Sequence, residues 1–380
     1  DWRQAATGEL KLGRALRRLG EKEAGEQLIR GVLARARARA DRAILIDALH
    51  QLAAIAWEEG DLDRCEQLAG QGLIAASGPS LSGSRAQILL ALTSVQAIRG
   101  QLAAATSGMV EAEGILKRLN RKQLRATVLN NIAELYIWQG ALTEALARAD
   151  EARALSREVL HREAEGTALR IRAMARLEIG DLAGAETDLG RSLAMAEEMA
   201  LSEDIVASRY LYGRLSVRRG QAATARTHLQ AGLVAARQQD PELYAPLLQA
   251  LLAWCWCVLD RAPVARKLLD NLQVRQETLP DPRRSEVCLW MAQARMALGE
   301  HSAALLLAEE ANRRAVSSGL RLTALRAKGL LCQLVPMDEA PAIAAAGRRL
   351  LRDIEAGSPP GAAASLRAED AVAALLETST

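Results

Sequence analysis

Apolar residues in this chain follow helical spacing, and the spacing is interrupted once every 40 residues. The stretch around Gly140 is typical: Leu129 and Ile132 lie on one face of a helix before the glycine, and Leu142 and Ala145 begin a second apolar face after it. Glycine adopts the left-handed conformation that ends a helix without steric cost. The pattern therefore predicts a helical hairpin, in which two amphipathic helices flank one glycine turn.

The same turn recurs along the whole sequence. It is expected near residues 20, 60, 100, 140, 180, 220, 260, 299 and 335, with glycine at most of these positions, Asp260 at one and Val335 in the last copy. A single hairpin cannot bury its apolar face alone, so neighbouring hairpins must stack. We therefore predict an all-α solenoid of about nine hairpins that forms one domain over residues 1–380, with a capping helix at 362–376. Loops are expected at 77–84 and 279–285, and a junction at Asp240-Pro241.

Small residues recur at fixed distances from each turn. Those seven residues before it are Gly13, Ala53, Thr93, Ala133, Ala173, Gly213, Ala253 and Ala292, and those five after it are Gly25, Cys65, Ala105, Ala145, Ala185, Ala225, Ala265 and Ala304. Small side chains at these points let helices approach closely enough to interlock.

This arrangement resembles the tetratricopeptide repeat over about residues 6–358. The period of 40 exceeds the common 34, and the usual closing proline is absent from most copies. Longer helices of this kind are similar to the sensor domains of MalT/LuxR-type regulators and of bacterial signalling (STAND) ATPases, to 40-residue repeats in peptide-binding scaffolds, and to quorum-peptide receptors of the Rap class. The resemblance implies a right-handed superhelix in which the first helix of each hairpin lines a concave groove.

Composition and charge exclude several classes of function. The formal net charge is only +3, which favours neither nucleic acid nor membrane as a default partner. The longest apolar run, residues 247–259, is too short to span a bilayer. The five cysteines lack metal or disulfide spacing, and their odd number suits a reducing compartment, so we expect a cytoplasmic protein.

Catalytic motifs are missing from the sequence. It contains no GxxxxGK[ST], GxGxxG after a strand, HExxH or GxSxG motif, and the four histidines fall in different hairpins. We therefore expect a protein that is not an enzyme and that has no cofactor, no catalytic residues and no metal site.

The groove is the expected binding surface. By the resemblance, residues ten, six, three and two before each turn point into it, which in the second copy selects His50, Ala54, Trp57 and Glu58. The candidate ligand or partner-binding residues are Asn130, Glu134, Trp138, Arg170, Tyr210, Arg214, Arg218 and Trp254. Arginines and aromatic rings dominate binding energy at interfaces, so we predict a basic, aromatic-walled pocket for an acidic group. An equally open alternative is that the arginines pair with Glu134 and Glu178 and hold the superhelix together.

A second basic cluster lies in the first hairpin. Its first helix carries Arg14, Arg17 and Arg18, and its second carries Arg30, Arg35, Arg37, Arg39 and Arg42. This cluster is either a solvated end of an arginine-rich chain or a docking surface for a preceding domain or an acidic partner. No base-reading side chain recurs in every repeat, so direct nucleic-acid binding is not expected.

Together these features predict a ligand-binding or protein-binding sensor arm of a multidomain bacterial signalling or transcription regulator. Its partner is a protein or peptide, or an acidic small-molecule effector, and no membrane is involved. The chain begins at Asp1 without an initiator Met, so we expect an output domain fused upstream. The alternative is a stand-alone peptide-binding or protein-binding adaptor.

Overall fold

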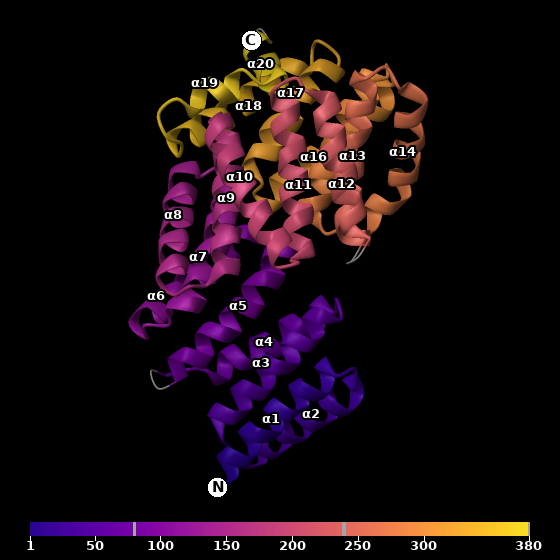
Figure 1. Ribbon diagram of the computed structural model, residues 1–380. Coiled ribbons are helices and arrows are strands. Elements are labelled where there is room, and N and C mark those ends of the chain that lie inside the picture. Colours follow the sequence, from indigo (N-terminus) through magenta and orange to yellow (C-terminus); the bar gives the residue numbers. More distant parts are fainter. Residues whose placement is uncertain (79–80, 238–240, 379–380) are drawn as a thin grey trace. The chain divides into compact units, whose positions relative to one another are not determined.

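The computed structural model describes residues 1–78, 81–237 and 241–378. These residues form twenty α-helices, α1 to α20, and the short 3₁₀ helix η2 (Gln276–Thr278), with no strand in the described ranges (Figure 1). The predicted all-α, tetratricopeptide-like fold class is confirmed.

The first eighteen helices form nine consecutive hairpins, which turn where the sequence pattern places them. The pairs are α1 (Trp2–Arg18) and α2 (Lys22–Ala38); α3 (Arg42–Glu58) and α4 (Leu62–Ala75); α5 (Ser82–Ile98) and α6 (Leu102–Arg118); α7 (Lys122–Trp138) and α8 (Leu142–Glu158); α9 (Arg162–Ile179) and α10 (Leu182–Glu198); α11 (Ser202–Arg218) and α12 (Ala222–Ala236); α13 (Pro241–Val258) and α14 (Ala262–Arg275); α15 (Asp281–Ala297) and α16 (His301–Ser318); α17 (Arg321–Leu334) and α18 (Ala340–Ala356).

A left-handed residue ends helices both within and between hairpins. The turn glycines have φ between 71° and 95°, and Gly140 donates to Ile137 while Ala141 donates to Tyr136, the bonding pattern of a Schellman cap. The turn between α16 and α17 also uses a glycine, Gly319, whereas four other turns between hairpins use Ala40, Asn120, Leu160 and Ala200 in the same conformation, with φ between 51° and 55°. Each of these costs about 1–2 kcal/mol relative to a right-handed residue. Helix packing on both sides must offset that cost.

The described chain divides into two compact units, unit 1 (Asp1–Val128) and unit 2 (Leu129–Thr380). Each unit has its own apolar core. The core of unit 1 includes the fully buried Ile29 and Ile46, and that of unit 2 includes Leu177 and Leu189. A single solenoid domain over 1–380 remains a prediction.

Within unit 2, the C-terminal helices pack back onto the hairpins that begin the unit. The N–H of Thr143, in the first turn of α8, donates to the carbonyl of Gly357 at 3.1 Å, and α19 (Ala362–Arg367) contacts α9 (Figure 1). Helix α20 (Asp370–Glu377) packs directly on α17. The backbone of Ala371 comes so close to Gly329 that a Cβ at position 329 would overlap the Ala371 carbonyl. Only glycine permits so close an approach at this point. Residues more than 150 positions apart are thereby joined in one unit.

The ends of some elements differ from the sequence-based expectations. Two short helices, α19 and α20, occupy the cap predicted as one helix at 362–376, because Glu369 between them is extended, with φ −73° and ψ 130°. The loop predicted at 279–285 ends early, since α15 begins at Asp281 and proline is tolerated at position 282 in a first helical turn. Helix α5 likewise begins at Ser82, inside the predicted loop 77–84. Residues 79–80 of that loop and Asp240 of the predicted junction lie outside the described residues.

Ala145 and Ala147 on α8 test the packing register. Ala145 is fully buried at the recurrent small position, whereas Ala147 is exposed on the same helix. We expect Ala145→Leu to destabilise unit 2 by about 1–3 kcal/mol through overpacking, and Ala147→Leu to have little effect. Urea unfolding followed by circular dichroism measures both changes, and equal shifts of the two midpoints would show that the register is wrong.

Candidate functional site

The predicted binding residues of α11 lie in a buried network of opposite charges inside unit 2. Arg214 of α11 donates to one carboxylate oxygen of Glu178 on α9 at 2.7 Å, and Arg326 of α17 donates to the other at 2.5 Å. The Glu178 side chain is only 3% exposed. One carboxylate on α9 therefore binds arginines from both α11 and α17, and α17 is about 150 residues away in the sequence.

A second carboxylate extends this network to the C-terminal segment. Arg326 donates to both oxygens of Glu369, at 2.7 and 2.9 Å, and Arg218 donates to Glu369 at 2.5 Å and to the hydroxyl of Ser365 at 2.7 Å. Arg326 thus bridges the two carboxylates. We call the resulting chain of Arg214, Glu178, Arg326, Glu369 and Arg218 the inner charge network.

The pKa of Glu178 shows that the two arginines more than compensate for the burial of its carboxylate. Burial alone would raise the pKa of Glu178, but the charges and hydrogen bonds of Arg326 and Arg214 outweigh burial and hold the pKa at about 2, below its ordinary value of 4.5. Glu178 is therefore ionised throughout the physiological range. Removal of one partner from such a buried pair leaves an uncompensated charge, which is costly.

Aromatic residues lie beside the inner charge network. We call the surface of unit 2 formed by this network with Tyr210, Trp254 and Trp290 the inner face. The Tyr210 hydroxyl donates to Glu286 on α15 at 2.6 Å and accepts from the indole N–H of Trp290 at 3.0 Å. Burial and the charge of Glu286 raise the pKa of Tyr210 well above its ordinary value. The rings of Trp254 and Trp290 are tilted, with centroids 6.4 Å apart, so Trp254 reaches the cluster through Trp290.

The candidates on α7 and α9 are bound to the next hairpin. Arg170 pairs with Asp204 at 3.2 Å; burial lowers its pKa, but Glu134 and Asp204 outweigh burial and the pKa is raised. The Asn130 amide N–H donates to the carbonyl of Ala164 at 2.9 Å, while its buried amide oxygen has no partner among the described residues. Trp138 is half-buried.

The structure thus places Tyr210, Arg214 and Arg218 of α11 in polar contacts inside unit 2, with Tyr210 buried and 25% of the Arg218 side chain exposed. The ion pair of Arg214 with Glu178, which is the structural alternative expected from the sequence, is present. Arg326, Glu369 and Glu286 escaped the sequence analysis. Trp290 also escaped it, although it stands 80 residues after Tyr210 and hence on the same 40-residue series. The turn glycine of that copy, Gly299, comes one residue early, so the position ten residues before it is Leu289 and not Trp290.

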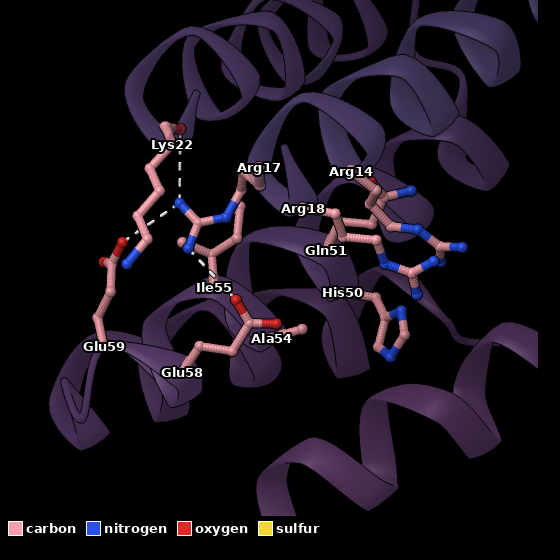
Figure 2. Close-up of a pocket in the computed structure, with 10 residues that line it drawn as sticks. All are labelled: Arg14, Arg17, Arg18, Lys22, His50, Gln51, Ala54, Ile55, Glu58 and Glu59. Carbon is pink, nitrogen blue, oxygen red and sulfur yellow. Dashed lines mark hydrogen bonds and ion pairs between the residues drawn. The ribbon is translucent and has the colours of Figure 1, made fainter. Parts of the chain in front are cut away.

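Unit 1 contains a pocket of about 360 Å³ between α1, the start of α2 and α3 (Figure 2). Its lining includes His50, Ala54 and Glu58 of the predicted groove and three of the five basic residues of α1. The full lining is Arg14, Arg17, Arg18, Lys22, His50, Gln51, Ala54, Ile55, Glu58 and Glu59. We call it the N-terminal pocket.

The described ranges contain no cluster of three or more His, Cys, Asp or Glu side chains able to hold a metal ion. None of the described helices combines the length and apolar character needed to cross a membrane.

No protein-family model matches the chain, and no curated protein matches it in sequence. The fold is similar to that of solved tetratricopeptide-like proteins. A Rap protein complexed with Competence and Sporulation Factor superimposes with a TM-score of 0.71 at 14% identity, covering 93% of this chain and 99% of that one. NprR in complex with its cognate peptide NprX gives 0.67 at 14% identity, covering 91% and 99%. The Rap conjugation gene regulator of plasmid pLS20 in complex with the Phr* peptide gives 0.59 at 10% identity, covering 86% and 96%. At such low identity these likenesses establish the fold.

Substitution of Glu178 tests the inner charge network. Because its folded pKa of about 2 lies below 4.5, Glu178 contributes stability that is present above about pH 4.5 and is lost as pH falls through about 2. We expect Glu178→Gln to destabilise unit 2 by about 3–5 kcal/mol at neutral pH and to weaken its acid dependence in that window. Urea midpoints measured from neutral pH down to about pH 2 report both effects.

Glu186→Gln is the matched control. Glu186 pairs with Arg219 at 2.8 Å on the surface, with half of its side chain exposed, so its loss should cost less than about 1 kcal/mol. Equal losses in the two variants would contradict a special role for the buried carboxylate.

Proposed function

We propose that this chain is a non-catalytic regulator that binds a peptide or protein segment on the inner face of unit 2. The proposed contact residues are Asn130, Glu134, Trp138, Arg170, Tyr210, Arg214, Arg218 and Trp254. One observation carries the proposal: Arg218 and Arg326 already hold a carboxylate and a hydroxyl from Glu369 and Ser365. Glu369 is itself an extended residue, and it lies between the short helices α19 and α20. The face therefore has the chemistry to recognise an acidic residue in an extended segment.

An incoming acidic segment would bind by exchange with Glu369. Its carboxylate would take the hydrogen bonds of Arg218 and Arg326, and α19 and α20 would be released from α9 and α17. Such a ligand shifts the balance between closed and released forms only by as much as it binds the released form more tightly.

The comparisons support a peptide as the effector class. All three of the similar structures named above are complexes, with Competence and Sporulation Factor, with NprX and with the Phr* peptide. They share the fold of this chain across most of their length. We extend peptide binding to this chain as a hypothesis and infer the contact residues from its own inner face.

Two biological settings fit this function. In the first, the chain is the sensor arm of a cytoplasmic, multidomain bacterial signalling or transcription regulator, with an output domain upstream. In the second, it is a stand-alone adaptor that binds a peptide or a partner protein. Release of α19 and α20 supplies the first with a conformational signal, and the second needs binding alone. The full reading frame distinguishes them.

Neighbouring arginines allow a sharp test of the binding face. Arg218 belongs to the inner charge network, whereas Arg219 pairs with Glu186 outside that network. Random peptides displayed on phage are selected on the wild-type protein, and the affinity of enriched peptides is then measured for both alanine variants. We expect Arg218→Ala to weaken binding by about 2 kcal/mol or more, roughly 30-fold in Kd, and Arg219→Ala to leave it unchanged. Failure to enrich any peptide, or equal effects of the two substitutions, would count against the proposal.

A further inference from the structure

The N-terminal pocket carries an excess of positive charge. Four cationic residues line it, Arg14, Arg17, Arg18 and Lys22, against the two carboxylates of Glu58 and Glu59, so the balance is 4 − 2 = +2. Both carboxylates already pair with cations, and Glu59 also pairs with Arg64, outside the lining, at 3.2 Å. Arg17 donates to Glu58 and to Glu59, at 3.3 Å in each case, and to the backbone carbonyl of Lys22 at 3.5 Å (Figure 2).

The remaining two arginines have no such compensation. Arg14 and Arg18 lie four residues apart on one face of α1, and both are exposed. No hydrogen bond or ion pair joins either guanidinium to another residue of the pocket lining (Figure 2). Like charges at this spacing repel each other slightly. The wall that they form with His50 therefore carries positive charge, while the two carboxylates of the pocket lining pair with Arg17.

Two residues of the lining, Ala54 and Ile55 on α3, are apolar. Ile55 is 4% exposed and Ala54 lies beside it on α3. This surface suits a short aliphatic stem, and the guanidinium forks of Arg14 and Arg18 suit a group with several acceptor oxygens.

We propose that the N-terminal pocket binds a phosphate monoester, with Arg14 and Arg18 contacting the phosphate oxygens, Lys22 adding charge, and Ala54 and Ile55 contacting the aliphatic stem. A doubly negative phosphate matches the local excess of +2, whereas a single carboxylate would leave positive charge uncompensated. This site is in unit 1 and does not rest on the function proposed for unit 2. The ester is either a phosphorylated side chain of a partner or a small phosphorylated molecule, and the test separates these sources.

His50 provides a reporter inside the pocket. Burial, and after it the charge of Arg14, lowers the pKa of His50. A bound phosphate offsets the charge of Arg14 and hydrogen-bonds to the protonated imidazole, so it should raise that pKa. The other histidines, His161, His228 and His301, lie outside the pocket lining and serve as internal references.

The experiment titrates the full chain with inorganic phosphate, with a short phosphoserine peptide and with the same peptide unphosphorylated, while histidine resonances are followed by NMR. We expect both phosphate probes to raise the pKa of His50 alone and the unphosphorylated peptide to have no effect. The double substitution Arg14→Ala/Arg18→Ala should weaken phosphate binding at least tenfold, about 1.4 kcal/mol. Arg118→Ala/Arg121→Ala removes the same charge from exposed positions of unit 1 outside the pocket and should leave binding unchanged.

Binding of inorganic phosphate or of the phosphoserine peptide in the pocket would support the proposal, and their relative affinities identify the source of the phosphate. Tighter binding of the phosphoserine peptide than of inorganic phosphate supports it with a phosphorylated partner as the source, and equal binding supports it with a small phosphorylated molecule as the source. Unchanged His50 resonances at millimolar phosphate would overturn the proposal. Equal losses in the two double variants would also overturn it, because they would show a diffuse charge effect. Circular dichroism verifies that both variants remain folded.

Discussion

The guanidinium of Arg326 is the contact on which the arrangement of unit 2 depends. It donates to Glu178 of α9 and to both oxygens of Glu369, and so joins an early helix of the unit to the C-terminal segment. A buried ion pair gains little net stability over apolar residues of the same size, because both charges must leave water. Its geometric demands are strict, however, since each donor needs an acceptor in one place. The network therefore specifies which helices face one another inside unit 2, while the apolar core supplies most of the stabilisation.

This division of roles makes the inner face suitable for binding. Glu369 is held by hydrogen bonds that any well-placed carboxylate can accept, and it comes from a segment of two short helices rather than from a long one. Its release also separates Leu366, Val372 and Leu375 of α19 and α20 from the core of unit 2, so an effector must offset that apolar loss as well as the lost ion pairs. The N-terminal pocket of unit 1 differs, because neither carboxylate of its lining is paired with Arg14 or Arg18.

Much of the fold could be predicted from the sequence because its causes are local. Glycines at 40-residue steps end helices, and small residues such as Ala145 mark the close approaches. The turns between hairpins carry weaker signals, since Ala40 and Leu160 adopt a conformation that neither residue favours, and only packing imposes it. The same rules selected Tyr210, Arg214 and Arg218 for the inner face. They could not supply Arg326 or Glu369, because the partners of these residues lie about 150 positions away, and the final copy has lost its turn glycine.

The inner charge network holds the C-terminal segment against the hairpins that begin unit 2. Amide hydrogen exchange of α19 and α20, compared between the wild type and Arg326→Met, tests it most directly, because methionine keeps most of the volume and removes the bridging charge. We expect exchange in residues 362–377 to accelerate about tenfold or more, which corresponds to about 1.4 kcal/mol, and exchange in α1 to α4 to stay unchanged. Unchanged protection of α19 and α20 in Arg326→Met would contradict it.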